Sequence, residues 1–305
     1  IIEAINGIQY AQLSSGGEDS SSVILEEFLS DNPQSRTADR LRFRQAETVF
    51  QTGDYEGAIR EFRQYLRVTN SDALAPEAYM NLGVAYRQVG QDDRAISSYQ
   101  TVINEYPNDD QVPGALTSLG LLYFDLDEYE TSHQYFSQLL QKERRFAQEA
   151  YIGMGNASLS RNQYEIAREE YEAALQINQG NEAASVGLGK VAVAERKYEE
   201  AQLILKPIAD RNTTEIGAEA QFFLGKSQQD QGNYEDAIAE YARVKILFEA
   251  FDTWVSLGMY FSAESNIQLG SRGDALAILN EIIEFYPGTE AATLAQALID
   301  RTGDS

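Results

Sequence analysis

The side chains that could do chemistry are few and isolated in this sequence. His133 is the only histidine, and the chain has no cysteine. A Ser-His-Asp relay needs a nucleophile and a carboxylate placed beside the imidazole, and no such motif accompanies His133. A zinc site would need several further ligands converging on the same residue. We therefore predict that His133 is an ordinary half-exposed helix residue, in a non-enzymatic protein with no catalytic residue, metal site or cofactor.

The charge of the chain limits its partners. It has 48 acidic and 24 basic residues, for a net charge of −24. Nucleic acids and anionic lipids carry the same sign, so we expect neither as a partner. No segment approaches the roughly 20 apolar residues that a membrane span requires, and we expect no span. The basic residues are 18 arginines and 6 lysines, a bias that fits a salt-adapted (halophilic) organism and equally fits ordinary acidic solubility.

A six-residue phrase recurs along the chain and identifies the elements that position its side chains. Five copies carry Tyr-Glu at their third and fourth positions, and two looser copies keep the leading Gly and the closing Ala. Successive copies begin 34 to 38 residues apart, a period typical of stacked helical repeats. The five copies are Gly53–Ala58, Asp127–Ser132, Asn162–Ala167, Arg196–Ala201 and Gly232–Ala237, and the looser two are Gly90–Ala95 and Gly270–Ala275.

Each repeat is expected to hold two helices. In residues 75–109, one amphipathic stripe precedes Gly90 and a second begins at Ala95. Gly90 ends the first helix because glycine readily takes a positive φ, and Pro107 ends the second. Helices of about 13 residues are unstable alone in water, so the two must pack on each other and on the next pair. Gly83 and Ala95 are small at the expected crossing point, where they allow the backbones to approach closely.

This arrangement resembles the tetratricopeptide repeat, whose pattern is Leu-Gly, then an aromatic residue, later Ala, a second aromatic residue and Pro. The resemblance implies an all-α fold, a right-handed superhelical solenoid of stacked antiparallel helix pairs with about 17 helices. It covers residues 1–305 as one solenoid, with a degenerate repeat at 1–37, seven matched repeats at 38–289, and a capping helix and tail at 290–305. The Leu-Gly element stands at Leu82-Gly83, Leu119-Gly120, Leu188-Gly189 and Leu224-Gly225.

The resemblance also implies that the first helix of each pair lines a concave groove for a protein or peptide with an apolar segment. Each repeat has two groove positions, and most side chains at these positions are apolar. Polar exceptions include Arg87 and Gln229. Curvature of the solenoid could instead bury many of them against neighbouring repeats, and that alternative stays open. The candidate partner-binding residues are Phe43, Phe50, Met80, Arg87, Phe124, Ile152, Leu159, Phe222 and Tyr260.

Chaperone-binding members of the family hold a C-terminal carboxylate with a clamp of Lys, Asn and Arg side chains on successive first helices. Asn156 matches one clamp position, but Gly153 stands where the upstream Lys belongs and Gly187 replaces the next Asn. Phe43 and Glu47 likewise replace the first Lys and Asn. We therefore expect no carboxylate clamp.

The sequence favours a non-catalytic binding scaffold, and the alternative is a self-assembly or spacer segment of a longer solenoid. An enzyme would need a further domain. The only tryptophan, Trp254, is either packed at a repeat interface or exposed as an anchor for a partner. The junctions at Tyr106-Pro107 and Tyr286-Pro287 are similar to those of bacterial envelope repeat proteins of the outer-membrane assembly lipoprotein and Tol–Pal coordinator type. They slightly favour the periplasm over the cytoplasm, although no export signal is visible after Ile1.

Overall fold

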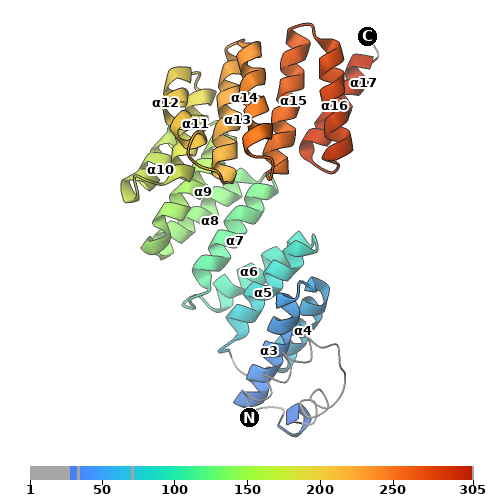
Figure 1. Cartoon of the computed structure of the whole chain (residues 1–305). Coiled ribbons are helices and arrows are strands. Elements are labelled where there is room, and N and C mark those ends of the chain that lie inside the picture. The colour runs from blue at the N-terminus through green and yellow to red at the C-terminus, as the bar shows by residue number, and fades with distance from the viewer. Residues whose placement is uncertain (1–27, 33–34, 70–71, 304–305) are drawn as a thin grey trace. The chain divides into compact units, whose positions relative to one another are not determined.

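The computed structural model describes residues 28–32, 35–69 and 72–303. Within these ranges the chain forms the fifteen α-helices α3 to α17, a further helical segment at residues 28–31 and one short 3-10 helix, with no strand (Figure 1). The predicted all-α stack of helix pairs is confirmed, and the expected number of about 17 helices is close. Most of the degenerate repeat predicted at 1–37 lies outside the described residues. The chain divides into unit 1, residues 1–143, and unit 2, residues 144–305, and the organisation as one solenoid stays a prediction.

Unit 1 contains three complete pairs, in which each first helix packs on the second helix that follows it. Its helices are α3 (Arg36–Gln51), α4 (Tyr55–Val68), α5 (Ala75–Gln88), α6 (Asp92–Glu105), α7 (Val112–Asp125) and α8 (Tyr129–Lys142).

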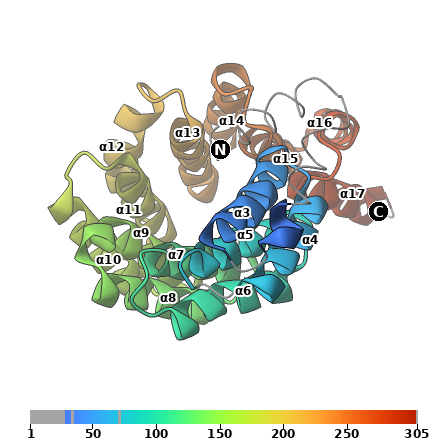
Figure 2. The same cartoon turned by 90° about the horizontal axis from the view of Figure 1, so that it is seen from below.

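Unit 2 contains four pairs followed by one unpaired helix, α17, at the position predicted for a cap. Its first helices form one layer, because α9 contacts α11, α11 contacts α13, and α13 contacts α15. Figure 2 shows α11 and α13 in that layer, with α10 and α12 in the other. The elements are η1 (Arg144–Phe146), α9 (Ala147–Ser160), α10 (Tyr164–Ile177), α11 (Glu182–Ala194), α12 (Tyr198–Ala209), α13 (Glu215–Asp230), α14 (Tyr234–Leu247), α15 (Asp252–Gln268), α16 (Arg272–Phe285) and α17 (Glu290–Gly303).

The recurring phrase forms the turn between the two helices of each pair. Its first residue has a positive φ in every copy, whether it is glycine, as at Gly232 (φ 81°), or not, as at Arg196 (φ 61°). In six of the seven copies the next amide closes the turn with a hydrogen bond six residues wide, as from Lys197 to the carbonyl of Ala192 at 2.8 Å. This is the Schellman ending of a helix. The turn therefore forms with glycine, which favours a positive φ, and also with other residues at its first position.

We expect Arg196→Gly to stabilise the protein by up to about 1 kcal/mol. A side chain in the left-handed region costs roughly 1–2 kcal/mol, and the greater freedom of glycine in the unfolded chain offsets part of the gain. The reverse change, Gly232→Ala, should destabilise by a similar amount, because a Cβ there meets nothing within 4 Å and adds only backbone strain. Urea denaturation of both variants measures the two effects. If both shift stability in the same direction, backbone strain does not control this turn.

In five of the seven pairs the helices cross at a glycine of the first helix, which we call the crossing glycine; Ala46 and Ala263 stand at the equivalent crossing position of the other two pairs. A Cβ at Gly83 would lie 2.5 Å from Cε1 of Tyr99, and one at Gly225 would lie 2.6 Å from Cε1 of Tyr241. Real Cβ atoms do not approach so closely, so the aromatic ring of the second helix occupies the space that a side chain would fill. The predicted role of Gly83 at a helix crossing is confirmed.

Candidate functional site

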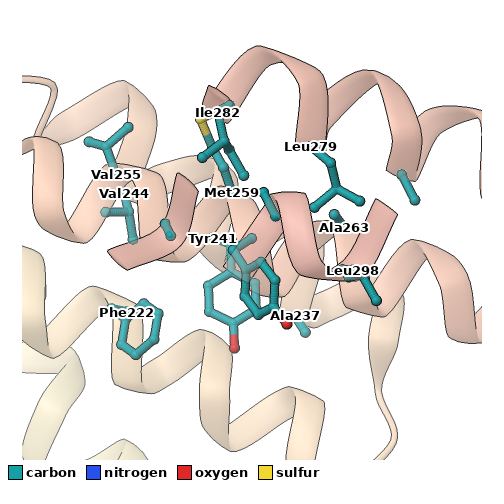
Figure 3. Packing of buried hydrophobic residues seen from close by; sticks show 14 residues of the cluster. Phe222, Ala237, Tyr241, Val244, Val255, Met259, Ala263, Leu279, Ile282 and Leu298 are labelled. Carbon is teal, nitrogen blue, oxygen red and sulfur yellow. The ribbon is translucent and has the colours of Figure 1, made fainter. Parts of the chain in front are cut away.

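Three of the predicted groove residues lie in the core instead. Phe43, Phe222 and Tyr260 are only 3%, 5% and 5% exposed. Figure 3 shows Phe222 among the buried residues of unit 2, where its ring centroid lies 5.6 Å from that of Tyr241. Each of the three stands three residues before the crossing position, which turns it only about 60° away from the crossing on a helix of 3.6 residues per turn. These side chains are therefore closed to a partner, and the groove they were expected to line does not include them.

The other six predicted residues are half-buried and contact residues of their own pair or of the next pair. The ring centroid of Phe124 lies 5.2 Å from that of Tyr129, and Arg87 forms an ion pair with Asp125. Phe50 stands edge-on to Tyr55. Each retains some exposed surface, so their contact with a partner stays a prediction. The six are Phe50, Met80, Arg87, Phe124, Ile152 and Leu159.

The residue after each crossing position is better placed for contact with a partner. It is turned about 100° from the crossing and is at least partly exposed in every repeat, up to 46% for Leu121. In unit 2 this position holds three different chemistries. They are the amide of Asn156, the amines of Lys190 and Lys226, and the carboxylate of Glu264.

A cleft of about 330 Å³ opens on the first-helix layer of unit 2. Its apolar surface comes from Phe261 and Ile267 of α15 and from Leu298 of α17. Gln229 and Ile267 stand at predicted groove positions and line this cleft. Its lining residues are Lys226, Gln229, Asp230, Tyr234, Phe261, Glu264, Ile267, Gln268 and Leu298.

Two polar side chains of this cleft are fixed from the core. The hydroxyl of Tyr241 donates to Oε1 of Gln229 at 2.8 Å, and that of Tyr260 donates to Oε1 of Glu264 at 3.0 Å. With its oxygen engaged, Gln229 presents its amide N–H groups, and Glu264 keeps a second carboxylate oxygen. The cleft therefore offers one fixed donor and one fixed acceptor beside an apolar surface.

Lysines cover two aromatic rings along the same layer. Nζ of Lys226 lies 5.7 Å from the ring centroid of Phe261, and Nζ of Lys190 lies 5.3 Å from that of Phe223. Lys190 also pairs with Glu219 at 2.7 Å, and Lys226 pairs with Asp230. Each ammonium is thus held by the electrostatic attraction of a ring face as well as by a carboxylate. The layer thus presents aromatic surface that lysine side chains cover.

The predicted groove residues did not include Phe223, Phe261, Lys190 or Lys226. Their places in the repeat could have identified them. Phe223 and Phe261 stand two residues before the crossing position, and Lys190 and Lys226 stand one residue after it. Those positions turn farther from the helix crossing than the ones we predicted. A helical wheel that starts at the crossing position would have identified these four residues.

Trp254 belongs to the core of unit 2. Its ring centroid lies 5.4 Å from that of Phe222 and 6.4 Å from that of Phe223. Its indole nitrogen is buried, and no described residue accepts a hydrogen bond from it. The interpretation of Trp254 as a packed interface residue is confirmed.

The buried tyrosines make stability depend on pH. Burial raises the pKa of Tyr171 and of Tyr241 well above the ordinary value, and raises the pKa of Tyr65 to about 12. Above about pH 10 the unfolded chain loses phenol protons that the folded chain keeps, so this stability is full below pH 10 and is lost as the pH rises.

We expect the free energy of unfolding to fall above about pH 10 by roughly 1.4 kcal/mol per pH unit for each such tyrosine. Tyr171→Phe should lower the free energy of unfolding by about 1 kcal/mol at neutral pH, because it removes the hydroxyl that donates a 2.6 Å hydrogen bond to Asn156. The variant should also show a shallower alkaline decline. Urea denaturation from about pH 8 to pH 11 measures both slopes, and parallel slopes would contradict the assignment.

The described residues contain no group of three or more His, Cys, Asp or Glu side chains that could hold a metal ion. His133 lies half-buried on α8. Among the helices of the described ranges, none has the length and apolar character needed to cross a bilayer.

Comparison with known proteins identifies the repeats. Models of the tetratricopeptide repeat match residues 43–110 and 117–182, and a second model with the same description matches residues 158–218. Together the matches cover more than half of the chain.

Curated relatives match over a shorter segment. The chain is 30% identical over 71 residues to the photosystem I assembly protein Ycf3 of a Synechococcus strain, a match that covers 23% of this chain and 39% of that protein. The chain thus spans well under half the length of this relative.

Two solved structures share the fold. A tetratricopeptide repeat protein from Parabacteroides merdae has a TM-score of 0.73 and 16% identity, over 85% of this chain and 98% of that one. PilW, a type IV pilus biogenesis factor, has a TM-score of 0.57 and 15% identity, over 75% of this chain and all (100%) of that one. At these identities the likeness shows the fold alone.

Proposed function

From the premise that this chain belongs to the tetratricopeptide repeat family, we propose that unit 2 binds a peptide segment of a partner protein in the cleft between α13, α15 and α17. Proteins of this family are typically protein-interaction scaffolds. The observation that carries the proposal is the pair of cleft side chains, Gln229 and Glu264, each held by a core tyrosine beside an apolar surface.

The chemistry of the cleft indicates the kind of segment. An apolar side chain would pack on Phe261, Ile267 and Leu298, and backbone amides would pair with Gln229 and Glu264. Because these polar groups are already oriented, binding spends little conformational entropy on ordering them. A cleft of this size encloses one or two side chains, which is typical of an anchor residue surrounded by weaker contacts.

The names of similar proteins favour a role in assembly. One relative is a photosystem I assembly protein, and one structural neighbour is a pilus biogenesis factor. Holding a segment of one component while a complex forms would suit a cleft of this kind. We also propose that the protein works in the bacterial envelope, the location that the Tyr106-Pro107 and Tyr286-Pro287 junctions slightly favour.

Selection of peptides on the full chain tests this function. Random twelve-residue peptides displayed on phage would be panned against the protein, and the selected sequences synthesised with a fluorescent label. We expect apolar anchors among them, and at least about tenfold weaker binding by Ile267→Ala, since losing a central anchor contact costs roughly 1.4 kcal/mol or more.

The matched control is Leu276→Ala, which removes an exposed aliphatic side chain from the second-helix layer of the same unit. It should bind the selected peptides as the parent does. Equal affinities for parent, Ile267→Ala and Leu276→Ala would exclude this cleft as the binding site.

A second candidate function, self-association, has its own observation. Three second helices of unit 2 end on exposed apolar residues at equivalent repeat positions. These are Ile177, Leu247 and Phe285, which are 53%, 53% and 65% exposed. Such a set favours contact with another surface. Sedimentation velocity distinguishes self-association from peptide binding. A self-assembling protein would change its average mass with concentration, and Phe285→Glu would abolish that change.

A further inference from the structure

Unit 1 carries a cleft of opposite character. Its volume is about 490 Å³, and it lies between the second helices α4 and α6 with α5 beneath. Arg63 and Arg67 line one side, and Arg94 lines the other. None of the described residues that line it is acidic. In a chain with 48 acidic and 24 basic residues, three arginines without a carboxylate form a local reversal of charge.

The two arginines of α4 are available to a ligand. Both are exposed, and neither forms an ion pair with another described residue. They stand four residues apart, so they project from one face of α4 on successive turns. Unneutralised cations in an acidic protein attract anionic groups and are not screened by close internal partners.

Arg94 is held in position on the opposite side. One guanidinium nitrogen donates to Oε1 of Gln91 at 2.8 Å, and the guanidinium carbon lies 5.7 Å from the ring centroid of Tyr86. These contacts fix the guanidinium plane and leave other N–H donors free, so it can take a carboxylate in the bidentate manner of arginine. The hydroxyl of Ser97 adds a further donor to the same wall.

We propose that this cleft binds an acidic segment of a partner protein, with carboxylates paired to Arg63 and Arg67 on one side and to Arg94 on the other. Two arginines a helical turn apart and a third across the cleft suit several carboxylates on one strand of peptide. The volume is within the range of ordinary ligand sites, about 300–1,000 Å³. This site does not depend on the cleft of unit 2.

Charge also argues against the other occupants. Two copies of this chain, each with a net charge of −24, repel one another, which disfavours a second copy. A nucleic acid needs an extended basic surface that neutralises many phosphates, and three arginines in an acidic chain do not supply one.

A fluorescein-labelled peptide of eight glutamates, titrated with the full chain and followed by anisotropy, tests the proposal. The double variant Arg63→Gln, Arg67→Gln should bind about tenfold more weakly than the parent. Arg60→Gln is the matched control, because Arg60 is an exposed arginine of the same helix that does not line the cleft. It should stay within about twofold of the parent, as is usual for a peripheral charge.

Several outcomes would overturn the proposal. These are no binding of the peptide, equal losses in the double variant and in Arg60→Gln, or tighter binding of a single-stranded oligonucleotide through the same arginines. Sedimentation velocity adds a last test. A parent dimer that the double variant converts to monomer would show that the occupant is a second copy. Circular dichroism confirms that the variants, which change only exposed side chains, are folded.

Discussion

Replacement of Gly187 by leucine is expected to lower the free energy of unfolding by about 3 kcal/mol or more, the upper range for an overpacked core. A Cβ at Gly187 would lie 2.3 Å from Cε1 of Tyr171, and one at Gly155 would lie 2.8 Å from the same atom. The ring of Tyr171, which is fully buried, therefore lies between two glycines on different helices. It has no space into which it can retreat. Urea denaturation followed by the fluorescence of Trp254 measures the loss.

The control for this prediction is another helical glycine of unit 2. A Cβ at Gly258, inside α15, would lie no closer than 3.6 Å to any atom. Gly258→Ala should therefore stabilise the protein by up to about 1 kcal/mol, since alanine favours the helix. Gly187→Ala should destabilise it. The same sign for both alanine variants would show that close contact with the Tyr171 ring does not decide the effect.

Phe222→Ala is expected to cost about 3–5 kcal/mol, as for other large-to-small changes in a core. Phe222 is 5% exposed and belongs to the buried cluster of Figure 3. Its ring lies against those of Tyr241, Trp254 and Phe261. The neighbouring Phe223 is only half-buried, so Phe223→Ala should cost clearly less. Urea denaturation compares the two variants. If Phe222→Ala leaves stability unchanged, this residue is not core and its original assignment to the groove returns.

Much of the fold could be predicted because it depends on local rules. The period, the left-handed turn and the small residue at the helix crossing each appear within one repeat. Gly83 and Gly90 therefore have the roles that their sequence context indicates. The turn at Arg196 obeys the same geometry without glycine, because the phrase as a whole defines it.

The site was harder to predict because burial depends on the neighbouring repeat. Phe222 and Phe223 are adjacent and chemically identical, yet one is buried and the other partly exposed. Their angle from the crossing position separates them, and contacts with Trp254 and Phe261 of α15 complete the burial of Phe222. The roles of Gln229 and Glu264 depend on tyrosines that reach them through the core, which no pattern within a single helix reveals.

The residue beside each crossing glycine has a consequence for how such a protein can change. The second-helix side chain that closes the crossing contacts the glycine, so the next position can hold Val84, Leu121, Asn156 or Lys190 while the crossing keeps its form. If the proposed binding on this layer holds, we expect mutation at that position to alter recognition at little cost in stability, and mutation one residue earlier to do the reverse. Selection for a new partner and selection for a folded chain thus act on adjacent residues without opposing each other.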